Sequence, residues 1–328
     1  MMKKTLQFKF LIIISVALFF SGCSGNSNTE FSNDKKSENI ISNKIHNNII
    51  SLAPSLTEIL YILNADSQIA GVTEFCIYPE AAKNKPKIGG YMNINYEQLI
   101  KLKPDLILAM QVHSENFKKF ERLNIRYETF SDKTVRDIRT SIEKISKLVG
   151  KEKECYEFLK IFDAEFSAKI KTENKLKPKV LVIVGREFGR LKNAVCAGRK
   201  SFYNDLINFA GGINAAPESG MEYNSLNSES IISMNPDIII EIYAPHSGMI
   251  AYKNEELLRK DWNIFKNVNA VKKGRVHYII NDYATLPGPR IYLLYKDIKK
   301  IMGYNIMTKT RDSDKRPISR NVISQINS

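Results

Sequence analysis

The sequence predicts an α/β protein made of two Rossmann-like lobes, with a ligand cleft between them and a long rigid helix that joins them. Three observations carry this prediction. One segment occurs twice, strand patterns alternate with helical patterns in both halves of the chain, and a strongly helical stretch separates the halves. With 328 residues, the chain is long enough to form two domains with hydrophobic cores of their own.

The repeated segment spans residues 97–108 and returns at residues 229–240, which is 132 positions later (229 − 97). Each copy reads as a short amphipathic helix that opens with Glu97 or Glu229, followed by a Pro-Asp turn and a buried apolar strand. An acid in the first turn suits the helix dipole, so this position alone explains each Glu. Two copies with no shift in spacing predict two similar lobes that face each other across a cleft.

The first lobe shows the alternation that is typical of a mainly parallel sheet. A capping box of Ser55 and Glu58 is expected to open its first helix. Strands are predicted at residues 48–52, 69–72, 106–109 and 126–130. Ligands of such sheets lie beyond the carboxyl ends of the strands. The predicted binding loops are therefore residues 53–55, 73–78 and 110–113, with the turn at 89–91 beside them.

The middle of the chain is predicted to be helical. Apolar residues from Val135 to Val149 recur on one face of a helix that ends at Gly150. Those from Cys155 to Ile170 continue the pattern in a second helix, which predicts a stiff connection between the lobes. The second lobe then repeats the alternation of the first. Its main predicted elements are strands at 179–184, 238–243 and 275–280 and a helix that begins at 287–290 and ends at Ile301.

The charge balance is strongly basic, with 49 Lys and Arg against 35 Asp and Glu, a net charge of +14. The lysines are scattered and no zinc-finger or RNA-binding pattern is present, so we do not expect a nucleic-acid partner. The chain also lacks a Gly-x-Ser-x-Gly elbow, a Gly-x-x-x-x-Gly-Lys phosphate loop and a His-Glu-x-x-His zinc motif. These absences argue against the common hydrolytic and redox enzymes, and we expect no enzymatic activity and no intrinsic cofactor.

The N-terminus reads as an export signal. Lys3 and Lys4 precede an apolar run over residues 10–20, which is too short for a good membrane span. The run ends in Phe-Ser-Gly-Cys, which resembles a lipoprotein lipobox with Cys23 as the lipidated residue. We therefore expect an exported protein that is lipid-anchored to the membrane, in a periplasm or at a cell surface.

Six segments follow from these features. They are the lipoprotein signal peptide (1–23), a flexible tether (24–47), an N-terminal α/β lobe (48–131), a connecting helical segment (132–177), a C-terminal α/β lobe (178–303) and a basic tail (304–328) that is predicted to be disordered.

The candidate ligand-binding residues lie in the loops that follow the predicted strands. His113 and His246 follow the two repeats at similar distances, so they are either ligands of a bound metal chelate or loop histidines without a metal role. Arg186 and Arg190 either pair with ligand carboxylates or are solvated surface arginines. An apolar and aromatic lining is predicted from Phe75, Tyr78, Tyr91, Met110, Phe188 and Tyr243, although some of these belong to the core. No direct metal site of the protein is predicted.

Three cysteines remain beside Cys23, namely Cys76, Cys155 and Cys196. An odd number argues against a disulfide framework. Cys155 lies on the apolar helical face and is predicted to be a buried thiol. A bond between Cys76 and Cys196 is left open as an alternative.

Taken in order, several motifs between residues 48 and 301 resemble one family. They are residues 50–58, Gly71-Val72, Tyr78-Pro79, both Pro-Asp repeats, residues 210–214, Trp262 with residues 271–276, and Pro-Gly-Pro-Arg at 287–290. The family is that of the substrate-binding lipoproteins of bacterial ABC importers for vitamin B12, iron siderophores and haem, the class III periplasmic binding proteins. The resemblance implies two α/β lobes, one long connecting helix and limited closure.

The resemblance also implies roles for particular residues. Glu97 and Glu229 match the two acids that dock with arginines of the ABC permease dimer, which works with its ATPase. Phe75 matches an aromatic position that lines the B12 cleft, whereas Met110 stands where a tryptophan is often found. The expected cargo is a ferric siderophore, cobalamin or another corrinoid, or haem. The alternatives are a surface adhesin and a metallocluster-type enzyme on the same fold.

Overall fold

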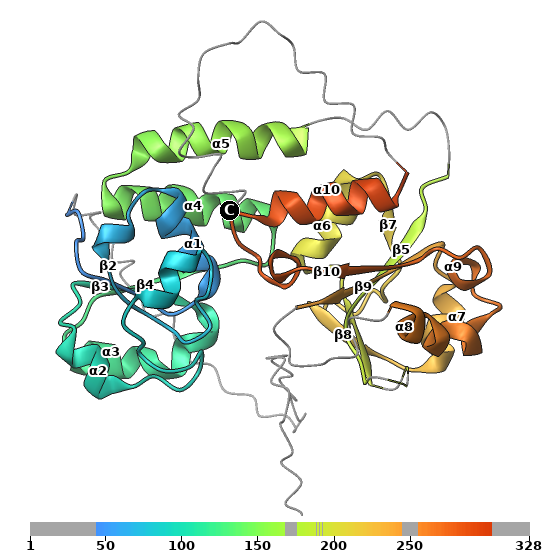
Figure 1. The fold of residues 1–328 in the computed structure, drawn as a ribbon, viewed down its shortest axis with the longest axis horizontal. Coiled ribbons are helices and arrows are strands. Elements are labelled where there is room, and N and C mark those ends of the chain that lie inside the picture. Colours follow the sequence, from blue (N-terminus) through green and yellow to red (C-terminus); the bar gives the residue numbers. More distant parts are fainter. Residues whose placement is uncertain are drawn as a thin grey trace, which may run out of the picture. The chain divides into compact units, whose positions relative to one another are not determined.

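The computed structural model describes residues 44–167, 176–187, 189, 191, 193–244 and 255–303. From Ile45 onward, the described residues belong to one compact unit, which contains two β-sheets (Figure 1). Cys23, most of the predicted tether, the basic tail, Phe188, Arg190 and His246 lie outside the described residues. None of the described helices is both long and apolar enough to span a membrane.

The first sheet is formed by four parallel strands in the order β2-β1-β3-β4. The four strands predicted for the first lobe are confirmed, with bounds β1 (Ile49–Ser51), β2 (Ile69–Val72), β3 (Leu106–Met110) and β4 (Tyr127–Phe130). Its helical elements are α1 (Pro54–Ile62), η1 (Asp66–Gln68), η2 (Glu80–Asn84), α2 (Tyr96–Lys101), η3 (Gln111–Asn116) and α3 (Phe117–Arg122). Strand β3 is buried along its whole length, which is why its sequence is a continuous apolar run.

The second sheet is mixed. Its parallel strands β7, β5, β9 and β10 pair in that order, like β2-β1-β3-β4, while β6 and β8 add an antiparallel extension beside β5. The strand bounds are β5 (Lys179–Gly185), β6 (Ala194–Ala197), β7 (Ile213–Asn214), β8 (Tyr223–Leu226), β9 (Ile238–Tyr243) and β10 (Val276–Ile280). The helical elements are α6 (Phe202–Phe209), α7 (Ser228–Met234), α8 (Glu255–Asp261), η5 (Trp262–Phe265), α9 (Asn269–Lys272), η6 (Asp282–Thr285) and α10 (Ile291–Ile301).

The predicted repeat is confirmed as α2 followed by β3 and α7 followed by β9. Asn95 and Asn227 cap the two helices, and each side-chain oxygen accepts the backbone N–H three residues later. Before the proline, Lys103 and Asn235 both have a positive φ, 47° and 41°. The two turns therefore share their backbone conformation as well as their sequence.

The repeated aspartates fasten each turn to the neighbouring central strand. Asp105 donates its backbone N–H to the Asn48 carbonyl oxygen, and its carboxylate accepts the N–H groups of Asn47 and Asn48. Asp237 makes the same kind of pair with the backbone of Lys179, at 2.8 Å and 3.0 Å. Each Asp thus fixes where β1 or β5 starts beside its partner strand.

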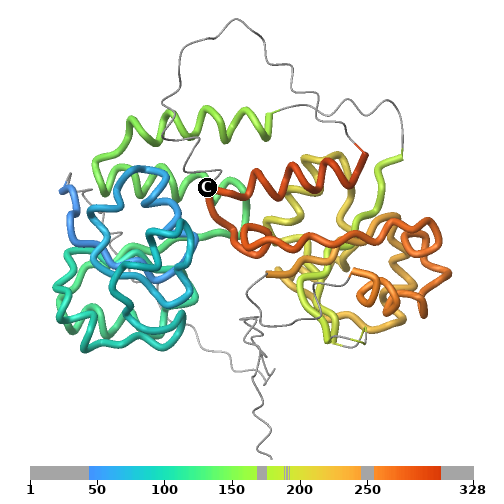
Figure 2. Tube along the Cα trace, viewed as in Figure 1, coloured from blue at the N-terminus to red at the C-terminus, as the bar shows by residue number. Residues whose placement is uncertain are grey.

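The connecting segment contains the two helices that its apolar pattern predicts, rather than the one long helix that the resemblance implies. Helix α4 (Val135–Val149) begins with a capping box of Thr134 and Asp137 and ends at Gly150, whose φ of 67° favours glycine. Helix α5 (Glu152–Ser167) follows it. Helix α4 contacts both α1 and α6, and α5 contacts α4 and α10, so this pair packs on helices from both halves (Figures 1 and 2).

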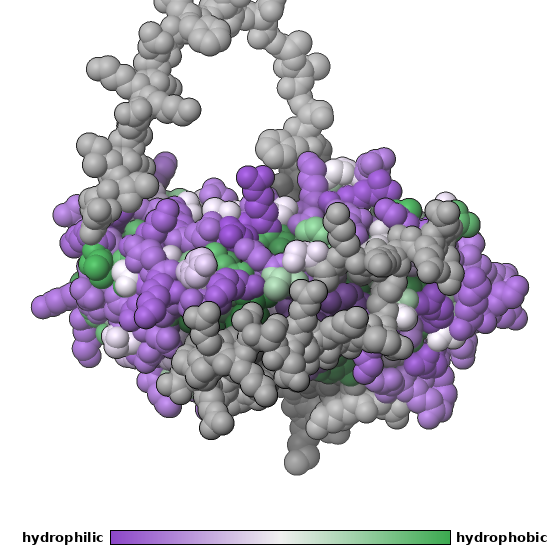
Figure 3. Space-filling view, turned by 90° about the horizontal axis from the view of Figure 1, so that it is seen from above, coloured by the Kyte–Doolittle hydropathy of each residue, from purple (hydrophilic) through white to green (hydrophobic). Residues whose placement is uncertain are grey.

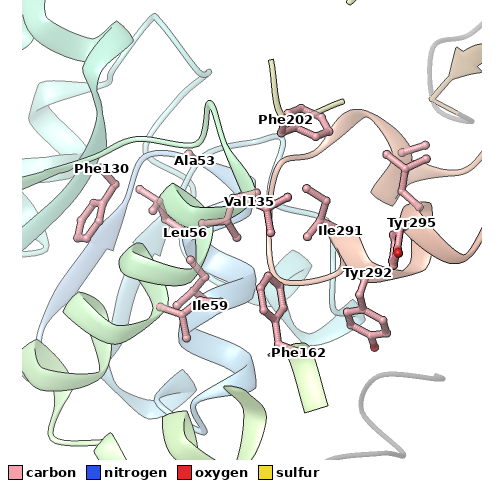
Figure 4. Close-up of a cluster of buried hydrophobic side chains, with 14 of the residues drawn as sticks. Ala53, Leu56, Ile59, Phe130, Val135, Phe162, Phe202, Ile291, Tyr292 and Tyr295 are labelled. Carbon is pink, nitrogen blue, oxygen red and sulfur yellow. The ribbon is translucent and has the colours of Figure 1, made fainter. Parts of the chain in front are cut away.

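One hydrophobic core continues from the first sheet to the second. The same cluster of buried side chains contains Ile49 and Leu106 of the first sheet and Val180 and Ile238 of the second. Figure 4 shows the helices that join them, with side chains from α1, α4, α5, α6 and α10 gathered in one place. The face of the molecule in Figure 3 is largely hydrophilic, with small apolar patches between charged side chains.

The capping box predicted for Ser55 and Glu58 is wrong. Helix α1 begins at Pro54 after Ala53, and no side chain among the described residues caps it. Proline suits this first position because its missing N–H would have had no partner there. Glu58 is instead buried in the middle of the helix.

Candidate ligand-binding site

The carboxyl edge of the first sheet is held by a buried cluster of hydroxyl and thiol groups. Thr57 Oγ1 lies 2.8 Å from Ser51 Oγ and 3.2 Å from Cys76 Sγ, and Thr73 Oγ1 lies 3.2 Å from the same sulfur. These contacts join the end of β1, helix α1 and the loop that follows β2. Burial raises the pKa of the Cys76 thiol, so the group stays protonated and serves as a structural anchor.

Phe75 lies in the loop that this cluster anchors, and its side chain is 58% exposed. The loop is fixed on both sides of Phe75, because the Glu74 N–H donates to the Gly89 carbonyl oxygen and the Cys76 N–H donates to Thr73. At Gly90, a Cβ would lie 3.7 Å from the Phe75 ring, which shows that the 89–91 turn lies beside it. A large aromatic side chain is thus presented to solvent from a rigid loop.

Tyr91 and His113 pack against each other next to this loop. Their ring centroids lie 4.8 Å apart in an edge arrangement. His113 is fully buried; its Nδ1 accepts the Met110 backbone N–H and its Nε2 lies 3.0 Å from the Tyr91 carbonyl oxygen. Burial lowers the pKa of His113 to about 4. The side chain predicted as a possible chelate ligand therefore holds two loops together, and neither of its nitrogens is free.

Arg186 is also engaged inside the protein. It follows β5, and its Nε donates to both carboxylate oxygens of Glu241 on β9, each at 3.1 Å. Its Nη1 donates to Asp261 at 2.6 Å. Glu241 accepts further hydrogen bonds from the Tyr243 hydroxyl and the Trp262 indole. With its cation neutralised twice and its side chain buried, Arg186 does not offer the free guanidinium that was predicted for a ligand carboxylate.

Met110 and Tyr243 lie at the ends of β3 and β9 and are buried, with 4% and 7% of their surface exposed. They belong to the packing behind the strand ends. Their place was predicted correctly, but their side chains face the core because both strands are buried on both sides.

A second buried ion-pair group was not anticipated from the sequence. Arg290, just before α10, donates two hydrogen bonds to Glu58 of α1, at 2.9 Å and 2.6 Å, and two to Asp282, at 3.1 Å and 2.8 Å. Its guanidinium lies 3.6 Å from the centroid of the Tyr78 ring, a cation–π contact. Arg290 therefore joins the half of the chain that holds the first sheet to the half that holds the second.

One feature of the sequence does indicate this group. Glu58 stands between Leu56, Thr57, Ile59 and Leu60, all of them buried, so a carboxylate occupies an apolar face of α1. A buried carboxylate requires a cation. Burial raises the pKa of Glu58, while Arg290 acts in the opposite direction through hydrogen bonds and charge.

Acidic side chains from both halves also come near each other. Burial, followed by the charge of Glu222, raises the pKa of Asp132 to about 7. Lys133 lies 4.0 Å from Glu222, and the Val135 N–H donates to Asp205 of α6 at 2.9 Å. The segment after β4 is thus fastened to the second half by polar contacts.

The three described cysteines are buried free thiols, so the alternative of a Cys76–Cys196 disulfide is wrong. Cys76 is held by Thr57 and Thr73, and Cys196 lies inside β6 in the other sheet. The predicted burial of Cys155 is confirmed. Among the described residues, no group of three or more His, Cys, Asp or Glu side chains is arranged to hold a metal ion.

Glu97 and Glu229 occupy the second position of α2 and α7, and both side chains are exposed. In the part of the chain that the structure describes, neither carboxylate has an ion-pair or hydrogen-bond partner. The two acids that open the repeats are therefore available to a partner protein.

Two α/β halves with equivalent parallel strand orders, joined by a common layer of helices, define the class of two-lobed solute-binding proteins. The sequence profile described as "Periplasmic binding protein" matches residues 49–283. The chain belongs to this family, whose members bind substrates for ABC transporters and are not enzymes. The resemblance inferred from the sequence motifs is thereby confirmed.

Individual relatives agree with this assignment. An uncharacterized ABC transporter substrate-binding lipoprotein of Bacillus subtilis, YvrC, is 30% identical over 266 residues, which cover 79% of this chain and 80% of the relative. The vitamin B12-binding protein of Vibrio vulnificus is 26% identical over 255 residues, 76% of this chain and 88% of its own. The crystal structure of a possible iron-binding (periplasmic solute-binding) protein from Staphylococcus epidermidis has a TM-score of 0.65 at 29% identity and covers 80% of this chain and 100% of its own.

Proposed function

We propose that this protein is lipid-anchored through Cys23 outside the cytoplasm, captures a metal chelate, and delivers it to the permease of an ABC importer. The chelate is a ferric siderophore, cobalamin or another corrinoid, or haem. One observation supports the binding role above all, namely the exposed ring of Phe75 on a loop that is fixed by buried hydrogen bonds.

The chemistry of Phe75 fits a large, partly apolar cargo. An aromatic ring that is more than half exposed gains free energy when a ligand covers it, and flat rings stack on it in an offset or edge arrangement. Corrin, porphyrin and catecholate ligands all offer such faces. The rigid loop reduces the entropy that binding would otherwise cost.

The ion pairs within the protein limit which residues can contribute to the affinity for the chelate. Arg186, which follows β5, and Arg290, which precedes α10, are each bound to two carboxylates. We therefore assign ligand contact to Phe75 and Tyr91 in the first lobe and to Phe188 and His246 in the loops of the second. Tyr78, Met110, His113, Arg186 and Tyr243 support these loops from behind.

The connection between the lobes fits a receptor with limited closure. We assign the connecting role to α4 and α5 together, because they contact helices from both halves. Arg290 adds a charged link between Glu58 and Asp282. Such a link restricts hinge motion, so the binding site is largely formed before the ligand arrives.

Replacing Phe75 with serine is expected to weaken chelate binding about 10- to 100-fold, since stacking and apolar burial of one aromatic ring contribute about 1.5 to 3 kcal/mol. The measurement is isothermal titration of protein lacking residues 1–23 with cobalamin, haem, and catecholate, hydroxamate and citrate ferric siderophores. Wild-type protein should bind one of them at a one-to-one ratio.

Tyr156→Ser provides a matched control, because Tyr156 is an aromatic residue on α5 that is 63% exposed. It should leave the affinity unchanged. Equal affinity of the Phe75→Ser variant would rule out the proposed platform. If the wild-type protein binds none of these chelates, the result would instead favour the surface adhesin.

The double variant Glu97→Ala/Glu229→Ala is expected to bind the chelate normally and to lose most of the uptake. The reason is that both carboxylates are exposed on α2 and α7, where they are positioned to pair with basic residues of the permease. Uptake of radiolabelled chelate into cells that carry the variant would be measured beside chelate affinity in vitro. Uptake at the wild-type rate would refute the docking role.

A further inference from the structure

The two copies of the repeat preserve six features, and four of them have a reason within the fold. Asn95 and Asn227 cap their helices. Leu99 and Ile231 are fully buried in the core. The prolines follow a residue with positive φ, and the aspartates fasten the central strands. The other two shared features are the glutamate and an isoleucine three residues after it.

The two isoleucines are exposed. Ile100 on α2 is 49% exposed and Ile232 on α7 is 57% exposed. Residues three apart on a helix are neighbours on its surface, so each isoleucine lies beside its glutamate, Glu97 or Glu229. Each helix turns the preceding residue, Leu99 or Ile231, into the core and leaves the isoleucine outside. A single exposed apolar side chain is ordinary, but the same side chain beside the same carboxylate in both copies points to a surface that another protein covers.

The residues around these pairs differ between the copies. Tyr96 stands where the other copy has Ser228, and Lys101 stands where it has Ser233. The shared surface is therefore limited to one carboxylate and one aliphatic side chain in each half (Figure 1 shows α2 and α7 in different halves). Two equivalent surfaces on one chain fit a partner that also presents its surface twice.

We propose that Ile100 with Glu97, and Ile232 with Glu229, form two matched docking faces for the permease dimer. Each face takes one basic side chain of a permease subunit through the carboxylate and one apolar depression beside it through the isoleucine. This inference rests on the proposed function and adds the apolar half of the contact. Within the described part of the chain the two carboxylates have no partner, which argues for the cation, and the half-exposed isoleucines argue for the apolar surface next to it.

The two kinds of contact give different salt dependence. Covering the exposed half of an isoleucine is not screened by salt, whereas a carboxylate–cation pair at the rim is. Replacing one isoleucine with serine is expected to weaken permease binding about tenfold, equal to about 1.4 kcal/mol. The double variant Ile100→Ser/Ile232→Ser should bind roughly 100-fold more weakly and keep the wild-type salt dependence, since the two sites are independent.

The test uses the full lipid-anchored chain and the permease–ATPase complex in lipid nanodiscs, with the dissociation constant measured by interferometry at 50 and 300 mM NaCl. Glu97→Gln/Glu229→Gln serves as the electrostatic comparison and should flatten the salt dependence. Ile264→Ser is the matched control, because Ile264 on η5 is 72% exposed and lies outside the repeats; it should bind like wild type.

Three outcomes separate the claims. Weak binding of the isoleucine variants, with chelate affinity and melting temperature unchanged, supports the inference. Wild-type binding of the isoleucine variants while the glutamine variants bind weakly would overturn the inference and leave the proposed function intact. No binding of wild-type protein to the permease would overturn both, even if the chelate panel still gave a ligand.

Discussion

Replacing Arg290 with alanine is expected to lower the free energy of unfolding by about 3 to 5 kcal/mol, the usual cost of removing one partner from a buried ion pair. Glu58 would lose both of its hydrogen bonds to the guanidinium while it remains 2% exposed. Asp282 would lose two more hydrogen bonds, and the Tyr78 ring would lose the cation above it. The measurement is urea denaturation at pH 7, followed by circular dichroism.

Two further variants make this result specific. Arg199→Ala removes an exposed pair with Glu218 and should cost about 1 kcal/mol or less. Glu58→Leu combined with Arg290→Met should recover most of the loss, because it removes both charges together.

In the single Arg290→Ala variant, the unpaired Glu58 takes up a proton more readily when folded than when unfolded. The loss of unfolding free energy in this variant, relative to wild type, should therefore become smaller as the pH falls from 7 toward about 4.3, the ordinary pKa of Glu. A loss below about 1 kcal/mol at pH 7 would show that Arg290 is not required for stability.

Glu241→Ala is expected to have an effect of similar size, about 3 to 5 kcal/mol, in the second half of the protein. Glu241 has no exposed surface and accepts hydrogen bonds from Arg186, Tyr243 and Trp262. Its removal takes the carboxylate acceptor away from the buried Trp262 indole and from part of the buried Arg186 guanidinium. The same denaturation experiment tests this prediction, and the fluorescence of the single tryptophan, Trp262, reports directly on the surroundings of Glu241.

Glu241→Gln is the informative comparison, since it keeps an acceptor oxygen but removes the charge. We expect it to cost less than alanine and more than Glu218→Ala, which removes the carboxylate of an exposed pair. Equal stability of all three variants would contradict the view that the Arg186 group holds the ends of β5 and β9 together. Chelate binding by the Glu241→Gln variant should survive, because Arg186 is buried behind the predicted binding loops.

The elements that were predicted best are those whose burial is evident from their amino-acid pattern. β3 is a continuous apolar run, β9 is one except for Glu241, and the Pro-Asp turn marks where each begins. The antiparallel strands β6 and β8 were missed because they are four residues long and contain Asn, Ser and Cys rather than an apolar alternation. The connecting segment was predicted as two helices with a stop at Gly150, and α4 ends there, whereas the one long helix that the resemblance implies does not form.

The candidate site was predicted less completely, for a physical reason. Sequence patterns place a residue at the end of a strand, but they do not say whether its polar atoms are already satisfied by the protein. His113 and Arg186 lie at the predicted loops, yet buried backbone groups and carboxylates engage them. Phe75 was predicted and is exposed. The link between Glu58 and Arg290 spans 232 positions, a separation that no local pattern reports.

The hydrophobic core that runs from β1 and β3 to β5 and β9 makes the two halves depend on each other for folding. If one half unfolded alone, apolar surface of the other half would lose its neighbours and become exposed to water. The free-energy cost of this exposure rises with the exposed area. The halves therefore melt as one cooperative unit rather than as two. A ligand that touches only the first half would thus protect the amides of both halves from hydrogen exchange, since exchange in either core requires the shared opening.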